Sequence, residues 1–226
     1  MKYYKWSGSN DGPRSSTTTP RTRMRKLSYF IGSTIDGFIA TPDGGFEFFF
    51  PYVTGEYASY LTAEYADTVF TPARVAAGID DAPNKHYDTV VMGRNTYEPG
   101  LAVGVTSPYA HLRQIVFSNS IAESLDPAVE VTAEDPLSVV RRLKQEDGLD
   151  IWLCGGGSLA GQLLPEIDEL IVKLYPIVAG SGIPLFSAGF AARNFELAES
   201  RTFDQGSVLL TYRKPATAAD AEPEQA

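Results

Sequence analysis

Short, mostly apolar runs recur along the chain, and segments with helical patterning separate them. Apolar runs of four to six residues are typical of buried parallel strands. They occupy residues 27–32, 89–92, 114–118, 129–132 and 151–154. Strands that alternate with helices in this way predict an α/β domain, in which helices flank a mostly parallel sheet.

Two helices and a late group of strands complete the pattern. Residues 136–146 begin with proline, repeat apolar side chains at helical spacing and end just before Gly148, which is typical of a helix. Residues 55–70 also have helical character, although tyrosine and threonine are frequent there. Three strands are predicted at 167–177, 195–203 and 207–213, with a turn at 204–206. The chain is therefore expected to end in an antiparallel hairpin at the edge of the sheet.

The two ends of the chain lack this apolar pattern. Residues 1–23 and 215–226 are predicted to be a disordered leader and a disordered tail, so that 24–214 forms one domain. A chain of 226 residues with 43% hydrophobic residues can bury a substantial core. No apolar run approaches the roughly 20 residues that span a bilayer, and the leader has no apolar signal core. We therefore expect a cytoplasmic protein without a membrane partner.

Charge and cysteine content exclude several classes of protein. The net charge is −9, of which +4 lies in residues 1–23 and −3 in 215–226, so the domain between them carries −10. A surface of that sign repels phosphate backbones, so no nucleic-acid partner is expected. One cysteine cannot form an intramolecular disulfide, and two histidines do not provide a metal site. A phosphate-bearing ligand must then be held by backbone amides and by one or two arginines.

Three glycines follow the last parallel strand and precede a predicted helix. Gly155, Gly156 and Gly157 let the phosphates of a ligand approach the backbone, and the first amides of the helix attract anions. The segment fits GxGxxA. However, several strands precede it and no acid follows about 20 residues later, so a Rossmann domain is not predicted. The alternative is a glycine turn that only packs the helix on the strand.

Two further strand ends carry groups that can bind phosphate. After the second apolar run, Gly93 is followed by Arg94 and Thr96, where the guanidinium can clamp a phosphate. A surface arginine beside a helix cap is the alternative. The third apolar run ends in Ser118 and Asn119, which by themselves form an ordinary turn. All three strand ends are expected at the carboxyl edge of one sheet, where open α/β sheets bind ligands.

Four segments, in order, resemble the dihydrofolate-reductase-like superfamily: VVMGRNTYE, IVFSNS, WLCGGGSLAGQLLP and IDELIVKLYPIVAGSGIPLF. The chain is most similar to the reductase domain of riboflavin-biosynthesis deaminase-reductases and to its stand-alone relatives, over residues 25–213. The resemblance implies a dihydrofolate-reductase-like sheet flanked by helices, with an antiparallel C-terminal hairpin. It further implies an NADPH-dependent reductase that transfers hydride to a small heterocyclic substrate, pterin-like or ribosylaminopyrimidine-like. Relatives often pair, so a homodimer is expected.

The resemblance also implies roles for individual residues. Contacts to the adenosine 2′-phosphate and the pyrophosphate fall on Gly93, Arg94 and Thr96, which favours NADPH over NADH. Ser118 and Asn119 are placed beside the adenosine phosphate. The loop of residues 33–40 lies against the nicotinamide and the substrate. The pyrophosphate cradle takes five consecutive residues, Gly155, Gly156, Gly157, Ser158 and Leu159.

The proton donor is harder to predict. Hydride transfer to a C=N or C=O group leaves a nitrogen or oxygen that needs a proton. Dihydrofolate reductases carry a carboxylate on the first helix, but the segment GGFEFFFPYVTGEYASY has no clean match, which puts folate reduction in doubt. The candidates are Asp36 and Glu47. Asp36 also fits ordinary Asp-Gly turn chemistry. Glu47 is either a carboxyl whose pKa is raised by neighbouring phenylalanines or a rim residue beside an aromatic core.

Two other classes of function stay open. The first is a non-catalytic NADPH-binding protein that has lost the substrate acid. The second is a phosphosugar-binding or nucleotide-binding module that uses the same glycine turn. No zinc deaminase motif of the form His-x-Glu with Pro-Cys-x-x-Cys occurs in the sequence.

Overall fold

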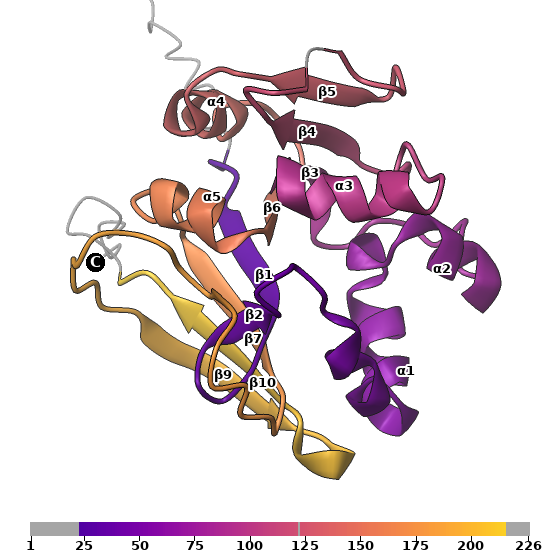
Figure 1. Cartoon of the computed structure of the whole chain (residues 1–226), viewed down its shortest axis with the longest axis vertical. Coiled ribbons are helices and arrows are strands. Elements are labelled where there is room, and N and C mark those ends of the chain that lie inside the picture. The colour runs from indigo at the N-terminus through magenta and orange to yellow at the C-terminus, as the bar shows by residue number, and fades with distance from the viewer. Residues whose placement is uncertain (1–22, 122, 216–226) are drawn as a thin grey trace, which may run out of the picture.

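The computed structural model of the chain describes residues 23–121 and 123–215. Its centre is an eight-stranded sheet in the order β5-β4-β3-β6-β1-β7-β10-β9 (Figure 1). The parallel strands are β1 (Leu27–Ser33), β3 (Tyr87–Gly93), β4 (Arg113–Phe117), β5 (Val129–Thr132), β6 (Asp150–Gly155) and β7 (Glu169–Leu174). The antiparallel strands are β9 (Glu196–Thr202) and β10 (Val208–Arg213), joined by the turn η3 (Asp204–Gly206). The predicted parallel sheet with a C-terminal hairpin is confirmed. Apart from Arg23 and Pro215, the predicted leader and tail lie outside the described residues.

Helices cover both faces of the sheet (Figure 1). One face carries α4 (Pro136–Leu143) and α5 (Gly157–Leu163), whose apolar side chains pack against β1, β3, β4 and β6. The other face carries η1 (Glu47–Tyr52), α1 (Gly55–Glu64), η2 (Ala66–Thr68), α2 (Thr71–Ala77) and α3 (Arg94–Ala102). We call the first the α4 face and the second the α1 face. Their opposite apolar clusters explain why the central strands carry apolar side chains on both faces.

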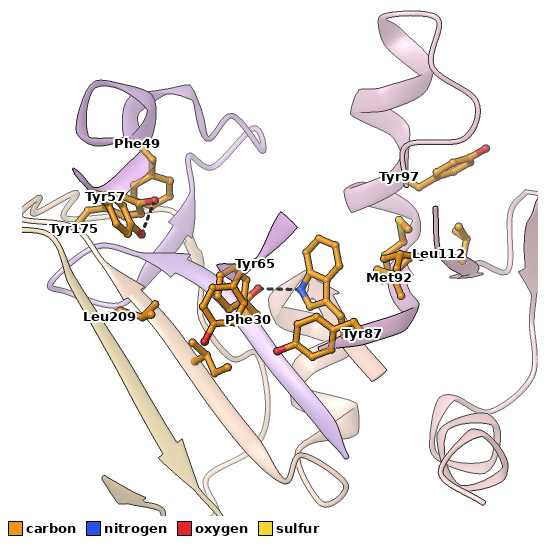
Figure 2. Packing of buried hydrophobic residues seen from close by; sticks show 14 of the residues in the cluster. Phe30, Phe49, Tyr57, Tyr65, Tyr87, Met92, Tyr97, Leu112, Tyr175 and Leu209 are labelled. Carbon is orange, nitrogen blue, oxygen red and sulfur yellow. Dashed lines mark hydrogen bonds between the residues drawn. The ribbon is translucent and has the colours of Figure 1, made fainter. Parts of the chain in front are cut away.

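The core of the α1 face is rich in aromatic side chains. Phe49 of η1 stacks on Tyr175 with 4.5 Å between ring centroids, and Tyr57 of α1 lies beside the same tyrosine (Figure 2). Further along the sheet, Phe30 of β1 stacks on Tyr65 at 4.6 Å. Aromatic pairs of this kind stabilise a core beyond their buried area.

The segment at 55–70 was predicted as one helix and is in fact broken. Helix α1 ends at Glu64, and the chain turns through η2 before α2 begins. The cause is Asp67, which is fully buried and accepts hydrogen bonds from the amides of His86 (2.8 Å) and Tyr87 (2.7 Å). Because this carboxylate serves the start of β3, the chain around it leaves the helical path.

A second, two-stranded sheet was not predicted. It pairs β2 (Phe38–Ala40) with β8 (Ile183–Pro184), and it ties the loop after β1 to the segment after β7. Strands this short leave no alternating pattern in the sequence. Their effect is to hold the 33–40 loop at the carboxyl edge of the main sheet.

Candidate functional site

The ends of β3 and β6 meet at the carboxyl edge of the sheet. Met92 of β3 is in register with Gly155 of β6, and Gly93 is in register with Phe117 of β4. A Cβ built on Gly155 would lie 3.4 Å from the Thr96 hydroxyl, and one on Gly156 would lie 3.7 Å from it. The glycine turn and the start of α3 therefore form one surface, as the sequence predicted from two separate segments.

The three glycines of the turn lie in different surroundings. Gly155 has φ +147°, a conformation that side chains disfavour, and its peptide bond to Gly156 is cis. Gly157 packs against β8, because its Cβ would stand 2.2 Å from the carbonyl oxygen of Pro184. Gly156 has φ −95° and ψ −171°, in the extended region, and outside its two chain neighbours an added Cβ would come within 4 Å only of the Thr96 hydroxyl. A positive φ and packing against β8 therefore account for Gly155 and Gly157, and neither accounts for Gly156.

The last two residues of the predicted cradle, Ser158 and Leu159, differ in exposure. Leu159 is buried in the core of the α4 face, so its side chain belongs to packing and only its backbone is available to a ligand. Ser158 is exposed. Within the predicted cradle, direct access to a ligand is thus concentrated at Gly156 and the backbone on either side of it.

The start of α3 presents a partly free arginine. The Arg94 side chain is 46% exposed, and its guanidinium lies 3.6 Å from the carboxylate of Glu98, one turn further along the helix. An exposed pair at this spacing contributes little to stability. Gly93 caps the helix without a side chain, so the first amides of α3 have no side-chain partner at the cap. An anion reaching this edge would meet both the amides and the guanidinium.

The strand end after β4 adopts the ordinary turn that was the alternative reading. The Ser118 hydroxyl accepts hydrogen bonds from the amides of Ser120 (3.1 Å) and Ile121 (3.0 Å). Asn119 is exposed next to this turn. The register of β4 with β3 places Phe117 opposite Gly93, so Ser118 and Asn119 follow directly after that position.

Asp36 is engaged in a structural contact. Its carboxylate accepts hydrogen bonds from the Thr34 hydroxyl (2.6 Å) and from the amides of Ala179 (3.0 Å) and Gly180 (2.7 Å). These bonds, the hydroxyl of Thr34 first, lower the pKa of Asp36 to about 2. The carboxylate therefore stays ionised near neutral pH, where it is a poor proton donor, and it joins the loop after β1 to the loop after β7.

Glu47 lies at the start of η1 with its side chain exposed. Its carboxylate accepts a hydrogen bond from the amide of Phe46 at 2.9 Å. The neighbouring Phe49 is the residue of this run that enters the core, while Phe46 and Phe50 are exposed. The geometry corresponds to the rim position that was the alternative for Glu47.

Sequence reasoning missed Lys173 on the α1 face. Lys173 is in register with Gly32 of β1, one residue before each strand ends. Its ammonium lies 4.5 Å from the centroid of the Phe30 ring. The available indication was a lysine between Ile171 and Tyr175, which are buried on the same face, inside a run predicted as a buried strand.

The described residues contain a cavity of about 200 Å³ at the opposite, amino edge of the sheet. Four carboxylates line it, from Glu64, Asp150, Glu169 and Glu199. Like charges disfavour phosphate there, so a phosphate-bearing ligand fits the carboxyl edge better.

Within residues 23–121 and 123–215, no three histidine, cysteine or acidic side chains are grouped to hold a metal ion. None of the helices there has the length and apolar composition needed to cross a bilayer.

Solved structures share this architecture. A putative riboflavin biosynthesis protein from Shewanella sp. PV-4 matches with a TM-score of 0.63 and 23% identity, over 84% of this chain and 99% of that one. A diaminohydroxyphosphoribosylaminopyrimidine deaminase/5-amino-6-(5-phosphoribosylamino)uracil reductase from Thermotoga maritima gives 0.56 and 16%, over 85% and 57%. Dihydrofolate reductase from Enterococcus faecalis, complexed with NADP(H) and RAB-propyl, gives 0.55 and 14%, over 84% and 97%. The fold is that of dihydrofolate-reductase-like reductases.

Sequence comparison places the chain within one branch of that class. The family model of the RibD C-terminal domain matches residues 25–209, so the chain belongs to the RibD C-terminal domain family. It is 31% identical to the uncharacterized protein YwjB of Bacillus subtilis (strain 168) over 187 residues, 82% of this chain and 96% of that protein. It is 34% identical to YyaP of the same strain over 102 residues, 44% and 54% of the two chains. The predicted resemblance is confirmed.

Proposed function

We propose that the protein is an NADPH-dependent reductase that transfers hydride to a small heterocyclic substrate, pterin-like or ribosylaminopyrimidine-like. The observation that carries this proposal is Gly156. Its φ and ψ are extended and, beyond its chain neighbours, only Thr96 lies within 4 Å of an added Cβ, yet the position is glycine. A ligand that lies against the backbone at this point supplies the missing reason.

The residues around Gly156 fit a dinucleotide. In the proposed complex the pyrophosphate lies along residues 155–159, while Gly93 and Thr96 contact it from the start of α3. Arg94 takes the 2′-phosphate of the adenosine, with Ser118 and Asn119 beside it. The bound nicotinamide supplies the hydride. The 33–40 loop, held in place by β2 and β8, covers the reacting edge and limits access of water.

A non-catalytic NADPH-binding protein is the second candidate function. The observation that favours it is the state of the two predicted acids, since Asp36 is engaged by two loops and Glu47 is exposed on the rim. Both functions share the cofactor site and differ at the substrate side. Oxidation of NADPH by any pteridine or aminopyrimidine supports the reductase, whereas saturable binding without turnover supports the second candidate.

Gly156→Val tests the cofactor site. A branched side chain at this position occupies the space proposed for the pyrophosphate, so NADPH affinity should fall tenfold or more, about 1.4 kcal/mol. The melting temperature should change little, because φ and ψ at Gly156 are extended and, outside its chain neighbours, an added side chain meets only Thr96. Fluorescence titration with NADPH and thermal unfolding measure the two quantities on the same sample.

Gly189→Val is the matched control for this substitution. Gly189 is exposed, and a Cβ built there meets nothing within 4 Å. Both affinity and melting temperature should stay as in the wild type. If Gly156→Val melts at a much lower temperature but still binds NADPH normally, the glycines serve only as a packing turn. Equal affinity of the wild type for NADPH and inorganic phosphate would instead favour the phosphate-binding module.

We also propose that the protein forms a homodimer. Strand β9 is one of the two outer strands of the sheet, and all seven of its residues are exposed, with Leu197 at 55%. Edge strands of this kind are covered in native proteins. Light scattering should give twice the 24.6 kDa of one chain. A single-chain mass over a wide range of concentrations would contradict the dimer.

A further inference from the structure

Lys173 occupies the centre of the carboxyl edge on the α1 face. From β7 its side chain reaches across to β1, where the ammonium sits over the Phe30 ring. Cys154, the penultimate residue of β6, lies close enough to influence the charge on the amine. Gly155, the next residue along, begins the glycine turn. The amine is therefore on the substrate side of the proposed cofactor site.

The ammonium has no acceptor among the described residues. No hydrogen bond or ion pair involves it there, although part of the side chain stays exposed. The Phe30 ring and the Cys154 thiol lie near it, and Leu209 is opposite Lys173 on β10. Tyr65 stacks on the same Phe30 ring. Burial raises the pKa of the Cys154 thiol to about 11 and also raises the pKa of Tyr65, so both stay neutral.

An unpartnered ammonium among aromatic rings is costly for the fold. Removing a charge from water without an acceptor destabilises a protein, and a cation–π contact returns only part of that cost. Burial accordingly lowers the pKa of Lys173 to about 8. A side chain retained at such a cost is typical of a group that meets a ligand.

We propose that the Lys173 ammonium is the donor that meets the substrate: it binds a carbonyl or imine acceptor of a flat heteroaromatic ring and gives that atom its proton. The proposal rests on the proposed reductase function. It assigns to Lys173 the task for which Asp36 and Glu47 were the predicted candidates. It also defines the substrate class as rings whose acceptor atom faces a cation rather than a carboxylate.

The step balances with the proposed cofactor alone. Hydride from the reduced nicotinamide forms a C–H bond at the carbon of a ring C=N group, and the π electrons of that bond move to nitrogen. The nitrogen takes a proton from Lys173 Nζ, which becomes a neutral amine. The oxidised nicotinamide leaves, and the amine regains a proton from solvent. An amine with a lowered pKa is better suited to this cycle than an ordinary lysine.

The test measures binding of 1,3-dimethyllumazine, a flat pteridinedione that offers only acceptors and has no proton to lose. Fluorescence titration is carried out with NADP⁺ present. The wild type should bind the probe, and Lys173→Met should weaken binding tenfold or more. Lys173→Arg, which retains a donor, should remain within about threefold of the wild type. Lys85→Met, at an exposed lysine, should have no effect.

Two further measurements separate a substrate donor from a structural lysine. Removal of an unpaired buried charge is neutral or stabilising, so Lys173→Met should melt no lower than the wild type. Probe affinity of the wild type should fall as the pH rises through about 8, while that of Lys173→Arg stays flat. A Lys173→Met protein that melts lower and keeps its probe affinity would show a structural cation–π contact and overturn the proposal. A wild type that does not bind the probe would also overturn it.

The proposed function fails on a different observation. If the wild type does not bind NADPH, the cofactor assignment fails. In that case, probe binding that depends on Lys173 in the absence of nucleotide would keep the lysine as a ligand-binding group. Normal NADPH binding with no effect of Lys173→Met on the probe would retain the cofactor site and remove the lysine from the substrate side.

Discussion

The two edges of the parallel sheet are built from different kinds of residue. At the amino edge, charged side chains hold the backbone where strands begin. Asp67 binds the amides that open β3, Asp168 accepts from the amide of Leu27 at 2.8 Å, and Asp150 accepts from that of Lys26 at 2.8 Å. Two of these carboxylates have basic partners as well, since Lys144 lies 2.7 Å from Asp168 and Arg23 lies 2.6 Å from Asp150. Charge-assisted hydrogen bonds therefore stabilise the amino edge of the sheet.

At the carboxyl edge the corresponding strands end in groups that the fold leaves available. β3 and β6 end in glycines, β7 carries an ammonium without an acceptor among the described residues, and the guanidinium of Arg94 is half exposed. Hydrogen bonds from backbone amides to a carboxylate, which fix the amino edge, are found at this edge mainly at Asp36. There they join two loops. Residues of the amino edge hold the sheet, and the proposed function assigns those of the carboxyl edge to a ligand.

Asp67→Ala should have the largest effect on stability. The substitution leaves two buried amides, of His86 and Tyr87, without their charged acceptor, so the free energy of unfolding should fall by about 3 kcal/mol. Asp67→Asn keeps one acceptor oxygen and should cost less. Denaturant unfolding measures both. The affinity of the folded protein for NADPH should change less than twofold, and a larger change would link the two edges.

Gly157→Ala should come next, and it marks the boundary between the two kinds of residue. The added methyl group would stand 2.2 Å from the Pro184 carbonyl oxygen, a backbone atom that cannot move away without shifting β8. Overpacking of this kind costs about 1 to 3 kcal/mol. Gly189→Ala, at an open position, should cost almost nothing. If Gly157→Ala instead lost NADPH affinity at unchanged stability, Gly157 would belong to the cradle that the resemblance implied.

The sequence was informative where a feature depends on neighbours in the chain. The apolar run of β6 followed by three glycines predicts a buried strand and a turn at its carboxyl end, and both are found. Helix α4 was predicted from its periodicity, and Asp135 caps it by accepting a hydrogen bond from the Ser138 amide at 3.0 Å. Such local patterns also carried the family resemblance.

Features that depend on distant partners could not be predicted from the chain alone. Asp36 looked like a candidate acid because its partners, Ala179 and Gly180, lie more than 140 residues away. The packing of Gly157 against the Pro184 carbonyl depends on β8, a separate strand. Lys173 became visible only when the register of β7 with β1 set its amine over Phe30. In each case tertiary packing, rather than local sequence, decides which contacts the residue makes.

Arg94→Ala should change cofactor selectivity more than stability. The guanidinium is partly exposed, and its contact with Glu98 at 3.6 Å contributes little to folding. NADPH affinity should fall by about 1 to 3 kcal/mol, the range for a lost charge-assisted hydrogen bond, and NADH affinity much less. Glu98→Ala is the matched control, since it frees the arginine without removing it and should not weaken NADPH. Equal losses for both nucleotides would show that Arg94 does not read the 2′-phosphate.

The smallest expected effect is an acid dependence at the amino edge that comes from His111. Its ring Nε2 lies 2.9 Å from the carbonyl oxygen of Asp67, and burial lowers the pKa of the imidazole below its ordinary 6.5. The unfolded chain therefore takes up a proton on this histidine at a higher pH than the folded protein does. Stability should be complete above about pH 6.5 and should decrease as the pH falls from there towards the lowered pKa.

His111→Gln isolates this contribution, because its side-chain amide can still donate to the Asp67 carbonyl but does not titrate. The free energy of unfolding, measured by denaturant between pH 5 and 8, should fall more steeply on the acid side in the wild type than in the variant. NADPH affinity should be the same for the two proteins throughout that pH range, because the imidazole lies at the edge assigned to stability. Parallel stability curves would remove His111 as the source of the acid dependence. A pH-dependent difference in affinity would contradict the separation of the two edges.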